Sequence, residues 1–359
     1  MSITSLSITA HLRDSVPLPG GAALVDGFAL ERRGGGSRRA LLRHGRELEV
    51  YDLDELFAGE RAPAAVFPVP RPEWERGGPS VSPDGSFAVF ADQRAVRAVA
   101  RDGSTLWEHP HDCWGFGGFH PHTGDEREPC PGPEHGSCRI SDDGRLVWAH
   151  IASASAARNC REHWVVLNAG DGGELARLPL RSESSGSFQL SHPDGAHVGL
   201  GIGMGQDGVL LHWARWDGAE LRSWGVNQEL DRILADVHPG HPGFLTVEHG
   251  GADLRLHALD GTVLAERTPE QDEDEDPPCW DHGCGFVDAD TVIASTLDSD
   301  GAPERARHWL LDARTLEIRG TVDYPDGPVD SYVRPLGDGT WLTYDDAYGT
   351  LDRWSTTEE

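Results

Sequence analysis

The chain has 359 residues, of which 38% are hydrophobic and 25% charged, enough apolar material for a continuous core. Its formal net charge is −29 and its pI is about 4.9, so its surface repels nucleic-acid phosphates and anionic lipid headgroups. We therefore expect neither a nucleic-acid nor a membrane partner. All 31 basic residues are arginine, which excludes Schiff-base catalysis by a lysine amine.

The N-terminal residues 1–14 have no basic segment followed by a long apolar run, and so do not predict a secretory signal. No window along the chain is apolar for long enough to predict a membrane span. We expect a cytoplasmic, monomeric protein. In that compartment the six cysteines are expected to be thiols or metal ligands rather than structural disulfides.

Short strands separated by tight turns follow one another along the chain. Residues 3–12 alternate polar and apolar side chains without a local partner, and residues 22–70 contain four degenerate strands. From there two hairpin patterns alternate, one turning at Ser/His-Pro-Asp-Gly, as in VSPDGSFAVFA (81–91), and one at Asp-Gly, as in VRAVARDGSTLWEHP (96–110). Asp-Gly tolerates the positive φ angles of a tight turn, and β-branched and aromatic flanks suit pleated strands.

Two successive hairpins make a four-stranded meander, and repetition at intervals of roughly 45–60 residues is typical of propeller blades. The sequence predicts an all-β, seven-bladed β-propeller formed by one domain over residues 1–359. The last blade has room for only three strands of its own, so we expect residues 3–12 to supply its outer strand and close the ring. The predicted blades span about 22–70, 79–110, 137–180, 186–226, 232–269, 284–325 and 331–355.

The Ser-Pro-Asp-Gly turn followed by an apolar strand resembles the WD40-like propeller repeats of bacteria, in the manner of uncharacterised actinobacterial propellers. The resemblance covers most of the chain and implies the fold, not an activity. The Trp-Asp dipeptide of eukaryotic repeats is not in register here, because Trp216–Asp217 is expected to precede a turn rather than to end a strand. We therefore do not expect this chain to contain the side-chain hydrogen-bond network of the eukaryotic repeats.

Two inter-blade loops, 109–138 and 268–285, interrupt the repeat and contain five of the six cysteines. Long loops from opposite blades could meet over the axial channel, where cysteine and histidine ligands would bind zinc or copper. The alternatives are solvated histidines with thiols filling the edge of the core, or disulfides joining Cys130 to Cys138 or Cys279 to Cys284. The candidate metal ligands are His111, Cys113, His120, His122, Cys138, Cys279, His282 and Cys284.

Carboxylates precede the innermost strands of three blades, at Asp236, Asp281 and Asp330. Together with Trp114 and Trp280 they form a second candidate, a channel-mouth site for a divalent cation such as calcium or for a cationic group. Equally, these carboxylates could accept hydrogen bonds from strand ends, which is the interpretation we favour.

Other patterns do not predict chemistry. Gly199–Gly208 is glycine-rich, but it leads into a strand rather than a helix and has no following Lys-Ser/Thr, so it does not predict a phosphate loop. No Gly-x-Ser-x-Gly elbow is present, and the order of Ser, His and acidic residues shows no triad. His192, His238 and His241 fall in the turns of the repeat and are best explained by turn chemistry.

Three functions follow from these patterns. The first is a non-enzymatic interaction scaffold for a protein or peptide that carries basic residues. The second is a metal-dependent enzyme with its site in the loops 109–138 and 268–285. The third is a redox or metal sensor that uses Cys138 and Cys284.

Overall fold

The computed structural model describes residues 6–18, 28–32, 38–70, 77–114, 134–153, 162–226, 231–240, 243–269, 278–297, 306–325, 327, 329, 333–345 and 349–357. These residues fall into two compact units. One contains residues 29–52 and 62–228, and the other contains residues 1–28, 53–61 and 229–359. We call them the central unit and the terminal unit.

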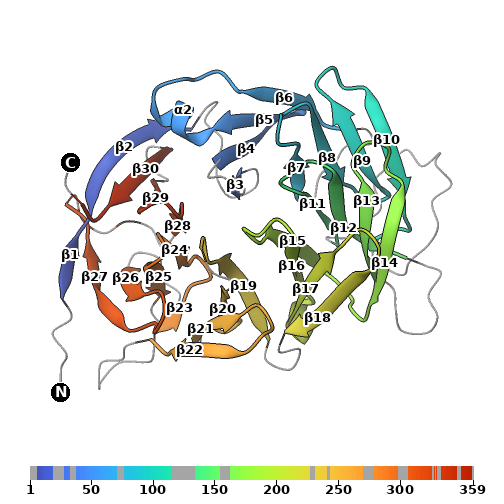
Figure 1. Ribbon diagram of the computed structural model, residues 1–359. Helices are drawn as coiled ribbons and strands as arrows, with labels where there is room; N and C mark the ends of the chain where they lie inside the picture. The colour runs from blue at the N-terminus through green and yellow to red at the C-terminus, as the bar shows by residue number, and fades with distance from the viewer. Residues whose placement is uncertain are drawn as a thin grey trace. The chain divides into compact units, whose positions relative to one another are not determined.

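The central unit contains four sheets, each a four-stranded antiparallel meander in chain order (Figure 1). The first strands of successive sheets, β7, β11 and β15, lie next to one another. The strands are β3 (Phe28–Arg32), β4 (Arg38–His44), β5 (Glu47–Asp52), β6 (Ala65–Pro68), β7 (Pro79–Val81), β8 (Phe87–Ala91), β9 (Ala95–Ala100), β10 (Thr105–Pro110), β11 (Ser137–Ile140), β12 (Leu146–Ala152), β13 (Glu162–Asn168), β14 (Glu174–Leu180), β15 (Gly186–Ser191), β16 (His197–Gly203), β17 (Val209–Trp216) and β18 (Leu221–Val226).

The terminal unit contains three sheets, one of which is enlarged to six strands. A five-residue helix, α2 (Leu53–Phe57), also belongs to this unit. Its strands are β1 (Ser7–Thr9), β2 (His11–Pro17), β19 (Arg232–Val237), β20 (Gly243–Glu248), β21 (Leu254–Ala258), β22 (Val263–Arg267), β23 (Cys279–Trp280), β24 (Gly285–Phe286), β25 (Thr291–Leu297), β26 (Arg307–Asp312), β27 (Ile318–Asp323), β28 (Val333–Pro335), β29 (Thr340–Asp345) and β30 (Thr350–Ser355).

The described residues thus contain seven sheets, and the predicted all-β class is confirmed. None of their helices is long and apolar enough to cross a membrane.

An N-terminal strand completes the last sheet, as expected, but it begins later than residue 3. The strand that pairs with β30 is β2, with Leu12 opposite Trp354 and Val16 opposite Leu351. The preceding strand, β1, lies in parallel along β27, the outer strand of the neighbouring sheet. The predicted strand 3–12 is therefore divided between two sheets.

Side chains at the turns explain why the hairpins form. In the Ser-Pro-Asp-Gly turn, the Asp84 carboxylate accepts the Ser86 N–H at 3.0 Å, and Gly85 adopts a φ of 65°. The Ser82 hydroxyl closes the turn by accepting the Phe87 N–H at 3.1 Å. Ser141 and Asp143 repeat this arrangement in the next sheet. Serine and aspartate recur at these hairpins because their side chains accept hydrogen bonds from the backbone N–H groups of the turn.

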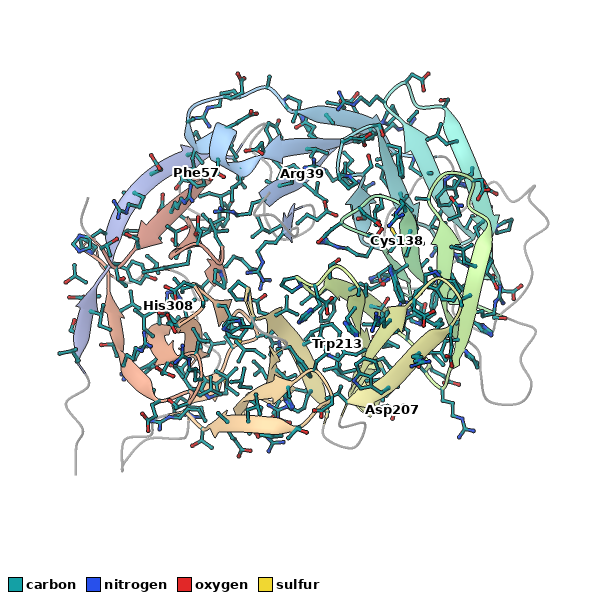
Figure 2. All side chains as sticks on the ribbon, viewed as in Figure 1. Arg39, Phe57, Cys138, Asp207, Trp213 and His308 are labelled. Atoms are coloured by element: carbon teal, nitrogen blue, oxygen red, sulfur yellow. The ribbon has the colours of Figure 1, made fainter. Side chains whose placement is uncertain are left out.

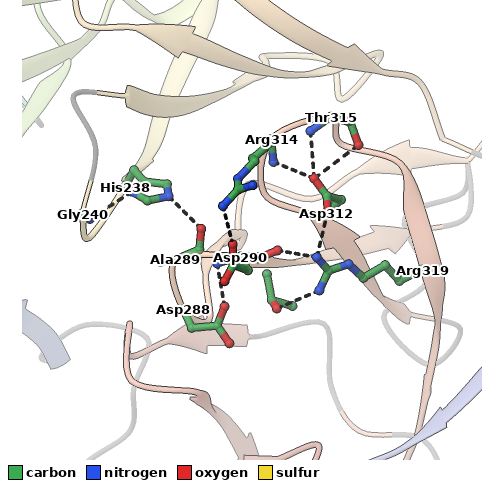
Figure 3. Close-up of polar contacts among 10 residues, drawn as sticks. His238, Gly240, Asp288, Ala289, Asp290, Asp312, Arg314, Thr315 and Arg319 are labelled. Atoms are coloured by element: carbon green, nitrogen blue, oxygen red, sulfur yellow. Dashed lines mark hydrogen bonds and ion pairs between the residues drawn. The ribbon is translucent and has the colours of Figure 1, made fainter.

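Histidine takes the place of the turn serine in two later sheets. In Figure 3, His238 accepts the Gly240 N–H through Nδ1 at 2.9 Å and donates from Nε2 to the Ala289 carbonyl at 2.9 Å. The second bond joins a turn to the next sheet, where Arg319 donates to Asp312 at 2.8 Å. His238 thus has the structural role that the turn sequence favoured, while His241 lies outside the described residues.

Buried indoles fasten the third strand of a sheet to the second. Trp309 donates to Thr296 Oγ1 at 2.9 Å, and Trp354 donates to Thr343 Oγ1 at 2.8 Å. Trp216–Asp217 precedes a turn, as expected, but the expectation that it does not end a strand was wrong for Trp216, which is the last residue of β17.

The role of β2 is testable by truncation. Deleting residues 1–17 removes β2, including buried Val16, and exposes the edge of β30. We expect a loss of several kcal/mol of unfolding free energy, seen as a fall of roughly 5 °C or more in the melting temperature. Deleting residues 1–9 removes β1 but keeps buried Ala10 and β2, and should cost less. Equal melting temperatures for both truncations and the full chain would contradict this role.

Candidate functional site

Cys138, on β11, is enclosed between neighbouring sheets of the central unit (Figure 2). Its thiol donates to the Gly78 carbonyl at 3.2 Å and lies 3.3 Å from the Val89 carbonyl. Burial raises the pKa of the Cys138 thiol to about 12. The thiol is therefore protonated at neutral pH, whereas metal binding and oxidation both require the thiolate.

Cys284 and Cys279 belong to the loop 268–285 of the terminal unit. Cys284 is buried, and burial raises the pKa of its thiol to about 12. Cys279 is half-buried, with its sulfur 3.8 Å from the Leu297 carbonyl. Both are free thiols, so the alternative of a disulfide between them is not realised, while Cys130 lies outside the described residues.

The described start of the other loop holds His111, Cys113 and Trp114. The ring nitrogens of His111 lie 2.6 Å and 3.1 Å from the carbonyls of Asp112 and Asp92. Cys113 is buried, and the buried Trp114 ring packs edge-on against His150 at 5.1 Å between centroids. His120 and His122 lie outside the described residues.

In the second loop the His282 ring stacks on His249 at 6.2 Å, and its Nε2 is 3.1 Å from the His249 carbonyl. The two loops belong to different compact units, so their predicted convergence remains a prediction. Zinc or copper binding by this set of ligands likewise remains a prediction.

Among the residues that the structure describes, one group of three candidate ligands lies within reach of a single ion: His192, Asp194 and His197. Asp194 Oδ2 is 3.1 Å from His192 Nδ1 and 2.6 Å from His197 Nδ1. These residues also form a turn of the repeat, in which Asp194 accepts the N–H groups of Ala196 and His197. The turn accounts for all three residue types without an ion.

Asp236 lies within β19, the first strand of its sheet, and not before it as expected, and its buried side chain joins two sheets. Its carboxylate accepts the Val237 N–H at 2.8 Å and, across to β24, the Phe286 N–H at 2.8 Å. Gly285 leaves no room for a side chain, since a methyl group there would lie 2.3 Å from Asp236 Oδ2. Asp281 accepts the neighbouring His282 N–H at 2.7 Å. The Asp236 contacts agree with the favoured interpretation, hydrogen bonding to strand ends, whereas the Asp281 contact lies within the loop between β23 and β24.

Besides Trp114, described above, the channel-mouth set includes Trp280 and Asp330. Trp280 is buried in the core of its sheet and donates its indole N–H to the Arg267 carbonyl at 3.0 Å. Asp330 lies outside the described residues. Cation binding at this set remains a prediction.

Exposed leucines at one repeated position were missed by the reasoning from sequence. The pairing of β10 with β9 skips Leu106, that of β14 with β13 skips Leu175, and that of β22 with β21 skips Leu264. Each is the extra residue of a bulge on an outer strand, and their exposed fractions are 53%, 43% and 57%. All three leucines end an Asp-Gly-x-x-Leu segment, beginning at Asp102, Asp171 and Asp260, but the same segment also begins at Asp26, Asp207, Asp217 and Asp338. Because Leu211 and Leu342 in two of these are buried, the motif alone does not predict exposure.

The outer strands β10 and β14 are neighbours in the central unit. The Trp107 indole donates to the Ala169 carbonyl at 2.7 Å, and its ring lies against Gly172. His109 Nε2 is 3.6 Å from the Glu174 carboxylate. Two of the exposed leucines therefore belong to adjoining strands.

A cavity of about 400 Å³ lies beside β26 and β27 in the terminal unit. Arg307, His308, Asp323 and Tyr324 are among its lining residues. The Tyr324 hydroxyl accepts the Trp341 indole N–H at 2.9 Å and donates to His308 Nδ1 at 2.6 Å (His308 is labelled in Figure 2). These two hydrogen bonds hold Tyr324 in the cavity wall and do not define a ligand.

No family model matches this sequence, and no curated protein matches it. Among solved structures, the chain is similar to the β-propeller domain of Myceliophteria thermophila Cps50 (Swd1), with a TM-score of 0.55 and 12% identity over 96% of this chain and 100% of that one. It is also matched to BBS1N, from a complex with ARL6DN, with a TM-score of 0.49 and 11% identity over 98% of this chain and 97% of that one. The first similarity confirms the WD40-like seven-bladed β-propeller fold.

Thiol reactivity tests the role of the cysteines. With a pKa of about 12, Cys138 and Cys284 each have about one thiolate in ten thousand at pH 8, so alkylation of the native protein should be slow. Of the four cysteines in the described part of the chain, half-buried Cys279 should react first. Iodoacetamide labelling followed by peptide mass spectrometry measures this order. Fast labelling of Cys138, or stoichiometric zinc or copper in protein purified without a tag, would favour the metal and redox functions.

Mutation distinguishes a structural role of Asp236, as an acceptor for backbone N–H groups, from a role in cation binding. Asp236→Ala leaves the buried Phe286 N–H without its acceptor, and we expect a loss of about 2 kcal/mol in unfolding free energy. Asp281→Ala, a control at a partly exposed position, should change stability by less than about 0.5 kcal/mol. Urea unfolding measures both. A stable Asp236→Ala protein that loses calcium binding would instead support the channel-mouth site.

Proposed function

We propose that this protein is an interaction scaffold whose partner is a protein or peptide carrying basic residues. The observation that carries the proposal is the repeated exposed leucine on the outer strands, at Leu106, Leu175 and Leu264. Each of these side chains is exposed at a bulge and is therefore available for contact with a partner. Exposed apolar groups rimmed by polar residues favour contact with another protein.

The central unit supports the proposal most directly, because Leu106 and Leu175 lie on adjoining strands. Both strands also carry acidic side chains, Glu108 on β10 and Glu174 on β14. The chain as a whole has a formal charge of −29, which attracts cationic partners over distances of about a Debye length. A segment that presents both apolar and basic side chains would match this surface.

The propeller fold is consistent with this role, since its sheets give a rigid frame on which outer strands can present side chains. Fold alone does not determine function. The proposal therefore depends on the leucine positions and the charge, and it can be tested at those positions.

Selection of peptides from a random displayed library tests the proposal with an unbiased set of candidate partners. We expect the native protein to enrich peptides containing arginine or lysine together with leucine-like side chains. The double variant Leu106→Ser/Leu175→Ser should bind the enriched peptides at least about tenfold more weakly, since each leucine contributes roughly 1 kcal/mol at such a contact. Binding is measured by fluorescence anisotropy, and it should weaken as salt is raised.

Leu6→Ser is the matched control, because Leu6 is 69% exposed but lies outside the repeated position. All three leucines are exposed, so the melting temperatures of the variants should be unchanged. Failure to enrich any peptide at low salt, or enrichment of peptides that bind the double variant equally well, would refute the proposal.

A further inference from the structure

A hydrogen-bonded series of side chains in the central unit ends at a half-exposed serine. It runs from β13 through β15 and β11 to β12, and it lies apart from the leucine positions. At its centre His150 and Glu162 are both fully buried, with His150 Nε2 3.0 Å from Glu162 Oε2. The other ring nitrogen, Nδ1, is 2.9 Å from the hydroxyl of Ser187.

The direction of the hydrogen bonds in this series is set by the Trp164 indole, which can only donate. The Trp164 indole N–H donates to Gln189 Oε1 at 3.1 Å, which fixes the orientation of the amide. Gln189 Nε2 then donates to the Ser137 hydroxyl oxygen at 3.1 Å and to its carbonyl at 3.0 Å. Because the Ser137 oxygen accepts this proton, its own hydrogen is left for another acceptor.

That acceptor is Ser187, whose oxygen lies 2.8 Å from the Ser137 oxygen. Ser187 Oγ is then placed to pass its proton to His150 Nδ1, while His150 Nε2 faces the Glu162 carboxylate. A hydroxyl within reach of an imidazole that a third group orients is the arrangement of an activated nucleophile.

Glu162 is held as an anion in spite of its burial. Burial alone would raise the pKa of its carboxyl, but hydrogen bonds and attraction from His150, with further hydrogen bonds from Ser182 and the Ser184 N–H, lower it. The Ser184 N–H donates to Glu162 Oε1 at 2.6 Å, and the Ser182 hydroxyl donates to Oε2. A buried carboxylate in this position stabilises an imidazolium that forms during proton transfer.

Within this series, Ser187 is the least buried residue. His150, Glu162 and Ser137 are buried, and the Trp114 ring closes one side of the imidazole, whereas Ser187 is half-buried. Gly186, the residue before it, has no room for a side chain because the His135 ring lies over it. Phe188, the residue after it, is 38% exposed, and its ring lies over Gly201 of the adjacent strand.

We propose that Ser187 is a nucleophile for small neutral or cationic carboxylic esters, with His150 as its general base and Glu162 as a positioning residue. Ser187 Oγ forms a bond to the acyl carbon, and its proton passes to His150 Nδ1. The ester C–O bond breaks, and the alcohol leaves with that proton. Water, deprotonated by His150, then attacks the acyl-serine and releases the carboxylic acid. The chain's charge of −29 disfavours anionic esters.

This inference goes beyond the scaffold function and does not depend on it. Reaction of the full chain with a fluorophosphonate probe tests it, because Ser187 Oγ would form a P–O bond while the P–F bond breaks and fluoride leaves. We expect one phosphonyl adduct per chain, located at Ser187 by peptide mass spectrometry. Ser187→Ala should abolish the adduct, while Ser185→Ala should not, since the Ser185 hydroxyl donates to the Gly203 carbonyl.

The variant Glu162→Gln separates positioning from structure. Its amide keeps the shape of the carboxylate but cannot stabilise an imidazolium, so the maximal inactivation rate should fall about 100-fold while the probe concentration at half-maximal rate is unchanged. Glu162→Asp should restore part of the rate. The melting temperature of each variant reports whether it folds. No adduct at Ser187, labelling spread over several serines, or a Glu162→Gln variant that folds and reacts at the native rate would each overturn the proposal.

Discussion

Side-chain hydrogen bonds between the first strands of neighbouring sheets are the interaction on which the rest of this structure depends. These strands lie next to one another but belong to different meanders, so polar side chains must satisfy backbone groups that face the gap. Ser80 accepts the Ile140 N–H at 3.0 Å in the central unit, and Asp236 does the same for Phe286 in the terminal unit. A buried N–H without such a partner would cost about 1–3 kcal/mol.

This constraint explains why two candidate ligands from the sequence, Cys138 and Asp236, have structural roles. Cys138 and Asp236 both sit on first strands, where the gap between sheets is dry and narrow. Burial keeps the thiol protonated, and the carboxylate is used twice by backbone N–H groups. Ser137 and Ser187 meet between a different pair of sheets, at β11 and β15, and there the polar series continues to half-buried Ser187.

The hairpins were predictable because each is encoded locally, by an aspartate that binds its own turn and a glycine that tolerates positive φ. The boundary between β1 and β2 was not, because an alternating pattern over residues 3–12 does not reveal which edge each half will join. Leu106 and Leu175 were visible in the repeat, although exposure depends on a bulge that composition does not report. Ser187, His150 and Glu162 come from three strands in two sheets, and no spacing in the sequence brings them together.

The bulges on β10, β14 and β22 have a consequence for the solubility of the chain. Among the described strands these three end their sheets, so each leaves backbone donors and acceptors on its free edge. A regular free edge is a template for pairing with a second copy, and repeated sheets multiply that hazard. An extra residue in the strand breaks the spacing of the free N–H and C=O groups and increases the local twist. The position that exposes each leucine therefore also guards its sheet against edge-to-edge aggregation.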